Sequence, residues 1–306
     1  MDYQQFLDEK VHQLRIVCLS QWDYLKYSNV SNWLEDNFKN DIEGKYYATK
    51  ILLHTLYYSK KDLEKLLLYG LNEKIYGELL KSELIRTDNI YIQHSDAETR
   101  ILKLKQASFF IPLSDSDKPQ ESGNAIVADL VHKLEVPAKD VDFVKNVDKN
   151  KLLDKKYLIF VDDCIGSGDQ LRDFLNSPKV EEIKNMCQEL DISIYYLALV
   201  GYQYNVEELI FNQYTVGVRI RVCDLLTEKN RVFSDENVIW ASKEEKVAAV
   251  QYFKNIESTK GIDLFGHGHL DFAIILHNRV PDWSLPIFWK EMTGWKCLIK
   301  RKNTYT

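Results

Sequence analysis

The feature that most constrains this chain is an alternation, beginning near residue 88, of short apolar runs with stretches of helical periodicity. This pattern is typical of βα units, in which helices connect parallel strands. We expect strands at 108–113, 157–161, 192–200, 215–223 and 272–276. We expect helices at 122–134, 168–175, 179–190, 204–212 and 243–257. Because the strand segments are apolar throughout, the sheet should be covered on both faces.

The chain before residue 88 has a different pattern. Apolar residues recur three or four apart and Gly and Pro are scarce, which predicts helices, including one over 42–57. We therefore expect an N-terminal helical region over 1–88 and an α/β domain over 89–306. No internal repeat or low-complexity linker separates them, so the boundary is a change of pattern and not a flexible joint.

Composition excludes several classes of protein. The five cysteines form no CxxC pair, which favours free thiols over a disulfide framework or a zinc ribbon. A net charge of −6 gives no general attraction to nucleic acid or to anionic lipid. No apolar run approaches the roughly 20 residues of a membrane helix, and the first ten residues are too polar for a secretion signal. We expect a cytoplasmic protein with no membrane span.

The segment 157–171, YLIFVDDCIGSGDQL, carries the chemistry of the chain. In an open α/β sheet, ligands bind beyond the carboxyl ends of the strands, and Asp162 and Asp163 directly follow the apolar run. Two adjacent carboxylates repel each other and are costly to desolvate unless something engages them. Ribose hydroxyls, or a Mg²⁺ held chiefly by a diphosphate, would do so.

A short loop follows these acids and leads into a helix. It contains Ile165, Gly166, Ser167, Gly168, Asp169 and Gln170. Glycines allow close backbone approach, the helix start adds free amides, and Ser167 adds a hydroxyl, so the loop suits a phosphate monoester. The ordinary alternative is a capped βα turn, but a strand, two acids, GSG and a helix in this order is much rarer than GxG alone. The spacing of acids and loop predicts a ribose 5-phosphate ligand.

These residues carry a resemblance to a known family. VDDCIGSGDQL (161–171) resembles the phosphoribosyl diphosphate (PRPP) signature of class I phosphoribosyltransferases. The resemblance implies a Rossmann-like parallel sheet of phosphoribosyltransferase type, flanked by helices, with PRPP or a nucleotide as ligand. It also implies Mg²⁺ bound through the diphosphate and ribose, with no residue assigned as a direct metal ligand. Gly166 stands where hypoxanthine-type members carry a catalytic Asp, so that general base is missing.

A wider resemblance is to phosphoribosyltransferase-like proteins of bacterial conflict and antiphage defence systems, some of them associated with retrons. It is carried, in order, by SNWLEDNF (31–38), a helical ATKILLHTLYYS (48–59), FIPLSDSDKPQESGNAI (110–126), FVDDCIGSGDQ (160–170), RVFSD (231–235) and HNRVPDWSLPIFW (277–289). The resemblance implies a toxic effector that acts on a nucleotide pool. Partners such as a reverse transcriptase with its nucleic acid would hold it in check.

A second loop, 110–126, repeats the order of apolar strand, polar loop and helix start. By resemblance it would hold the diphosphate, with Ser114, Asp115, Lys118, Ser122 and Gly123 as the candidates. The alternative for Lys118 is a solvated position on a capped surface loop.

The C-terminal third offers weaker candidates. Trp283, in the polar stretch PDWS, is the candidate for stacking on a base, whereas Trp289 is expected in the core. Arg231 is expected to form a surface salt bridge. His267 and His269 have a spacing that can ligate zinc, but flanking glycines and the lack of a second cluster favour an ordinary loop.

The sequence thus predicts an enzyme of phosphoribosyltransferase type acting on PRPP or a nucleotide. Asp162 and Asp163 would position the ribose hydroxyls, residues 165–170 the 5-phosphate and residues 114–123 the diphosphate. Because no general base is identified, two alternatives stay open: a non-catalytic subunit that senses PRPP or a nucleotide, and a scaffold with a relict pocket.

Overall fold

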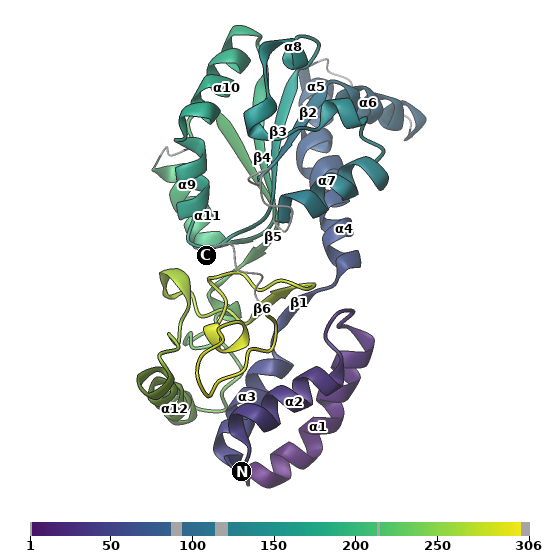
Figure 1. Cartoon of the computed structure of the whole chain (residues 1–306). Coiled ribbons are helices and arrows are strands. Elements are labelled where there is room, and N and C mark those ends of the chain that lie inside the picture. The colour runs from purple at the N-terminus through teal and green to yellow at the C-terminus, as the bar shows by residue number, and fades with distance from the viewer. Residues whose placement is uncertain (1, 87–93, 114–121, 213–214, 301–306) are drawn as a thin grey trace. The chain divides into compact units, whose positions relative to one another are not determined.

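The computed structural model describes residues 2–86, 94–113, 122–212 and 215–300, which form two compact units (Figure 1). Unit 1 combines Met1–Leu63 with Leu226–Thr306, and unit 2 is Glu64–Leu225. Unit 2 is therefore inserted into the chain of unit 1. This division differs from the boundary expected near residue 88, because the C-terminal segment packs with the N-terminal helices.

Unit 2 is built on a four-stranded sheet with the strand order β2-β3-β4-β5. The strands are β2 (Ser108–Pro112), β3 (Tyr157–Ile165), β4 (Ser193–Tyr202) and β5 (Val218–Leu226). β3 pairs parallel with β2 and with β4, so Ile159 lies between Phe110 and Tyr195. These are the strands that the apolar runs predicted, and the α/β class with a parallel, helix-flanked sheet is confirmed.

Helices cover both faces of this sheet (Figure 1). The helices of unit 2 are α4 (Lys60–Tyr69), the π-helical η1 (Gly70–Gly77), α5 (Glu78–Arg86), α6 (His94–Gln106), α7 (Ser122–His132), α8 (Lys149–Leu152), α9 (Asp169–Leu175), α10 (Pro178–Glu189) and α11 (Gln203–Phe211), with the short 3₁₀ turns η2 (Ala138–Asp140) and η3 (Val144–Asn146). On one face, α9, α10 and α11 pack on Phe160 and Tyr196. On the other, the Tyr76 hydroxyl donates to Ser108 Oγ at 3.1 Å. Cover on both faces explains why the strands are continuously apolar.

Unit 1 joins a helical N-terminus to a C-terminal segment rich in turns. Its elements are α1 (Tyr3–Ser20), α2 (Tyr27–Phe38), α3 (Ile42–Leu53), β1 (Leu56–Tyr58), η4 (Glu228–Asn230), α12 (Lys243–Lys260), η5 (His267–His269), β6 (Ile274–Leu276) and η6 (Pro286–Phe288). The helix starts follow capping rules. Asp2 caps α1, Asp41 caps α3 by accepting from Gly44 N, and Ser242 caps α12.

A two-stranded parallel sheet, β1 with β6, joins the two halves of unit 1 (Figure 1). Leu56 pairs with Ile274, and Tyr58 pairs with Leu276. The prediction that residues 48–59 are helical throughout is therefore wrong: α3 ends at Leu53. The physical reason is that β6, far along the chain, offers backbone partners that local periodicity does not reveal.

The core of unit 1 also holds a charged pair between helices. Lys50 of α3 and Glu245 of α12 form an ion pair at 2.6 Å. The Lys50 ammonium lies 5.1 Å from the ring centroid of Tyr46 and 5.6 Å from that of Trp240. The Tyr46 hydroxyl and the Ala241 N–H also donate to Glu245, so the carboxylate has three partners. The buried charges are thus paired, as their desolvation requires.

Candidate functional site

The two acids of the motif lie within β3 and not beyond its end. The strand continues to Ile165, with Asp162 opposite Ala198 and Ile165 opposite Gly201 of β4. Asp162 is buried and Asp163 is half-buried, and their two carboxyl groups interact with each other. Asp162 lies on the side of Phe160 and Tyr196. The expectation that the strand ends at residue 161 is therefore corrected, because β3 continues to Ile165.

Asp162 is 4% exposed, and other groups of unit 2 engage both of its oxygens. The Tyr196 hydroxyl donates to Oδ2 at 2.6 Å, and the Asp163 N–H donates to Oδ1 at 2.9 Å. Burial raises the pKa of Asp162 well above its usual range, and repulsion from Asp163 adds to this effect. Burial, and then Asp162, raise the pKa of Tyr196 as well. Asp162 therefore supports the strand end, while Asp163 is the half-buried acid at this position.

The loop after β3 is fixed in shape by glycine and by α11. Gly168 has φ +85° and ψ −4°, a left-handed conformation that favours glycine. A Cβ at this position would lie 2.7 Å from Cδ1 of Leu209, which is buried in α11. Asn205 Nδ2 donates to the Gly166 carbonyl at 2.9 Å. The backbone of the loop is therefore held in one arrangement on the adjacent helix.

Polar groups of the loop lie at the start of α9. Ser167 Oγ accepts a long 3.4 Å hydrogen bond from Asp169 N, and Ser167 and Asp169 are both half-buried. Arg172 pairs with Asp169 at 3.3 Å and so brings a positive charge to this first turn, while Gln170 is exposed. Backbone amides, a hydroxyl and a guanidinium are the groups that bind phosphate in proteins.

The predicted diphosphate loop is largely outside the described residues, which do not include Ser114, Asp115 and Lys118. Ser122 and Gly123 begin α7, as the sequence predicted for a helix start. The side chains of Ser122 and Gly123 are not among those that the structure describes.

Trp283 belongs to unit 1 and is 3% exposed. Its ring packs edge-to-face on Phe272, with centroids 5.2 Å apart. The prediction that Trp283 stacks on a base is therefore corrected, because its ring is buried in the core of unit 1 and packs against Phe272. Trp289 is half-buried and packs against the core of unit 1, and its indole N–H donates to the Ser284 carbonyl at 3.2 Å.

Arg231 forms two salt bridges, one with the partly exposed Glu228 at 3.2 Å and one with a buried acid. It pairs with Asp271 at 2.7 Å and also donates to the His269 and Leu270 carbonyls. The Asp271 carboxylate accepts as well from Phe233 N at 2.7 Å. Arg231 therefore holds a loop in place.

No three His, Cys, Asp or Glu side chains gather as a metal site in the described part of the chain. Of the two motif acids, Asp162 is buried and hydrogen-bonded, so it is a poor ligand for a hydrated divalent ion. A single half-buried carboxylate, Asp163, suits a Mg²⁺ that takes most of its ligands from phosphate and ribose oxygens.

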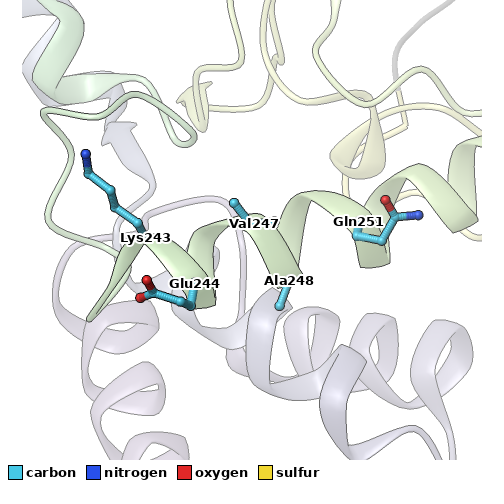
Figure 2. Close-up of a pocket in the computed structure, with 5 residues that line it drawn as sticks. All are labelled: Lys243, Glu244, Val247, Ala248 and Gln251. Atoms are coloured by element: carbon cyan, nitrogen blue, oxygen red, sulfur yellow. The ribbon is translucent and has the colours of Figure 1, made fainter.

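A pocket of about 520 Å³ lies along α12 in unit 1 (Figure 2). Its lining residues are Lys243, Glu244, Val247, Ala248 and Gln251. All five come from one helix, so the pocket is an open depression and lacks the enclosing walls of a ligand site. The motif of β3 belongs to the other unit.

Two residues that support the β3 loop, Tyr196 and Asn205, were not predicted from the sequence, although a sequence feature points to each of them. Tyr196 is a polar aromatic within an otherwise apolar strand, and a buried Tyr hydroxyl requires a partner. Asn205 follows β4, the parallel neighbour of β3, so the strand-end rule that selected the β3 loop also points to it.

Comparisons with known proteins find one matching family and a similar solved structure. The model of the PRTase-CE family matches residues 30–301. Among solved structures, the chain is similar to orotate phosphoribosyltransferase from Aeropyrum pernix, with 17% identity and a TM-score of 0.25. That match covers 40% of this chain and spans 61% of the length of the orotate enzyme. No curated protein matches the chain.

The parallel sheet and the loop after β3 define a phosphoribosyltransferase-like α/β protein. Since the family model covers most of its length, the chain belongs to the PRTase-CE family. No helix in residues 2–86, 94–113, 122–212 or 215–300 is long and apolar enough to span a membrane.

Proposed function

We propose that this protein is a cytoplasmic enzyme of phosphoribosyltransferase type that acts on PRPP or a nucleotide. The observation that carries the proposal is the loop after β3, in which left-handed Gly168 and the anchored Gly166 carbonyl fix the backbone at the start of α9. A glycine-containing turn with backbone amides, a hydroxyl and one cation at a helix start is suited to a phosphate group next to an acid that can bind hydroxyls.

The residues take different roles in this proposal. Asp163 binds the ribose hydroxyls, while Asp162 positions it by accepting its backbone N–H. The amides of the loop and Ser167 bind the 5-phosphate, and residues 114–123 bind the diphosphate. Mg²⁺, bound through diphosphate and ribose oxygens with Asp163 beside it, would neutralise charge on the departing diphosphate. The protein contributes mainly positioning and electrostatic stabilisation.

A second function is a non-catalytic sensor of PRPP or a nucleotide. Gly166 at the position of a familiar catalytic acid favours this alternative. Product analysis by mass spectrometry after incubation with PRPP, Mg²⁺ and a panel of bases and nucleotides separates the two. Turnover supports the enzyme, whereas tight binding without turnover supports the sensor.

The double change Asp163→Asn with Ser167→Ala tests the site itself. Losing a charge-assisted and a neutral hydrogen bond should cost about 3 kcal/mol in total, or roughly 100-fold in affinity for PRPP with Mg²⁺. Isothermal titration calorimetry measures this loss, and circular dichroism checks that the fold is kept. The matched control is Asp173→Asn, which removes an exposed acid from the same helix, α9, and should leave affinity unchanged. Unchanged affinity in the double variant would refute the site.

We also propose a biological setting in antiphage defence, with a reverse transcriptase and its nucleic acid as partners. The support is the ordered resemblance of six segments described above. Phage plating on cells that carry the complete system, with and without the double change, tests it. Equal protection by both forms would contradict a role for the β3 loop in defence.

A further inference from the structure

A second set of polar side chains lies in unit 1, at the carboxyl ends of two parallel strands. β1 ends at Tyr58, β6 ends at Leu276, and His277 follows immediately. The His277 N–H donates to the Tyr58 carbonyl at 2.6 Å, so His277 closes this edge of the sheet. Carboxyl ends of parallel strands are where α/β proteins place functional groups.

The backbone of His277 is unusual. Its φ is +55°, in the left-handed region, which histidine adopts more often than most side chains. In this conformation the chain turns directly after β6, and the ring lies beside Asp23.

Asp23 orients the His277 ring. Nδ1 of His277 lies 3.0 Å from Asp23 Oδ1. Asp23 also accepts from the Tyr57 hydroxyl at 2.7 Å and from Lys60 N at 2.8 Å. Burial acts to raise the pKa of Asp23, but the hydrogen bonds from His277 and Tyr57 outweigh it, so this pKa is lowered.

The protonation of the pair follows from these contacts. Asp23 is ionised at neutral pH and therefore only accepts hydrogen bonds. The imidazole must then carry its proton on Nδ1, which leaves a lone pair on Nε2 when the ring is neutral. The side chain of His277 is 25% exposed, and no group in the described part of the chain is hydrogen-bonded to Nε2. The ring of Tyr24, itself exposed, lies edge-on beside the imidazole at 5.5 Å.

We propose that Asp23 and His277 form a second site, in unit 1, at which Nε2 of His277 accepts a proton from the hydroxyl group of a small molecule or from water. The O–H bond breaks, an Nε2–H bond forms, and the electron pair stays on the oxygen. Asp23 balances the charge of the resulting imidazolium, and the proton returns in the reverse step. The site does not depend on PRPP binding by unit 2.

Carbethoxylation by diethyl pyrocarbonate near neutral pH probes this lone pair without a substrate. Nε2 attacks the carbonyl carbon of the reagent, and ethyl carbonate leaves and decays to ethanol and carbon dioxide. Peptide mass spectrometry of the full chain gives the rate at each histidine. We expect His277 to react at least as fast as the more exposed His267 and His269. We expect Asp23→Asn to slow the reaction of His277, because the ring loses the carboxylate that keeps the proton on Nδ1.

The control for a general effect of the substitution is Asp62→Asn. Asp62 accepts hydrogen bonds from Ser59 at the start of α4. This change therefore removes a carboxylate that caps a helix of the chain but is not itself hydrogen-bonded to Asp23 or His277. His277 should react at the wild-type rate in this variant. A His277 rate that is negligible in the wild type, or that is equal in wild type and Asp23→Asn, would overturn the proposal.

A variant of His277 itself separates proton transfer from a purely structural role. His277→Asn tolerates the left-handed backbone and keeps a donor for Asp23, but it lacks Nε2. The melting temperature should stay the same or rise. A clear fall in melting temperature would mean that the imidazole serves packing, and it would overturn the proposal.

Discussion

Replacing Gly168 with alanine tests the loop geometry on which the β3 site depends. The residue has φ +85°, so alanine must either adopt a left-handed conformation or shift the loop. Its Cβ would also lie 2.7 Å from Leu209 Cδ1 and 3.2 Å from Leu209 Cγ. Leu209 is buried, so its side chain cannot move into solvent.

The expected loss of stability in Gly168→Ala has two parts. A left-handed conformation costs an L-residue about 1–2 kcal/mol. Overpacking of a buried site costs typically about 1–3 kcal/mol more, since carbon atoms prefer separations of about 3.5–4.0 Å. Gly168→Ala should therefore lower the free energy of unfolding of unit 2 by roughly 2–5 kcal/mol. The affinity for PRPP should fall as well, because either response displaces the loop amides.

Gly217→Ala is the matched control. Gly217 is also in unit 2 and has φ +78°, but no described atom lies within 4 Å of a Cβ built there. This change should cost only the conformational part, about 1–2 kcal/mol. Adding Leu209→Ala to Gly168→Ala should relieve the steric part, so the double change should cost about 1–3 kcal/mol less than the sum of the single changes.

Urea unfolding followed by far-UV circular dichroism is the appropriate assay. All six tryptophans, at positions 22, 33, 240, 283, 289 and 295, belong to unit 1, so their fluorescence reports on the other unit and serves as an internal reference. Two results would refute the packing of the loop against α11. One is a loss of unfolding free energy in Gly168→Ala no larger than in Gly217→Ala. The other is a loss in the Gly168→Ala, Leu209→Ala double variant equal to the sum of the two single losses.

Two further predictions concern buried charges. Because burial raises the pKa of Asp162 above its ordinary 3.8, the folded chain binds this proton more tightly than the unfolded chain, and stability falls as pH rises from about 3.8 through the raised value. Asp162→Asn should therefore become more stable relative to wild type as pH rises across that window. The gain should be about 1.4 kcal/mol for each tenfold difference in proton affinity between the folded and unfolded chains, measured by urea unfolding at several pH values. A stability difference between variant and wild type that does not change with pH would contradict this. Lys155 pairs with Asp140 at 2.7 Å, with both side chains 5% exposed or less, so Lys155→Met should cost about 3–5 kcal/mol in the same assay. Lys155→Met with Asp140→Leu should recover most of that loss, and no recovery would show that the pair is not the cause.

The sequence predicts β2, β3 and β4 well because each contains a long apolar run, whereas β5 alternates apolar residues with Arg219 and Arg221. The end of β3 is less predictable. Asp162 and Asp163 are poor strand formers and indicate an end at Val161, yet backbone pairing with β4 continues to Ile165. The consequence is functional, because this pairing places both acids inside the strand, where Asp162 is buried and Asp163 is half-buried.

Other features depend on contacts between distant segments. Trp283 stands among polar residues and is predicted to stack on a base, but it packs against Phe272 in the core. The three residues of β1 are too few to show strand periodicity within a helical pattern. The boundary of unit 1 is hidden for the same reason, because its two segments are separated by the whole of unit 2.

One rule, that ligand groups lie at the carboxyl ends of parallel strands, points to both proposed sites. For β3 the rule can be applied to the sequence alone, because the strand, the acids and the glycine loop are contiguous. For β6 the rule cannot be applied to the sequence alone, because it needs a parallel partner strand and the sequence does not reveal β1 within a helical pattern. Nothing in the segment HNRVPDW then marks His277 as a candidate site residue. Its left-handed backbone and its contact with Asp23, 254 residues earlier, become visible only once β1 and β6 are paired.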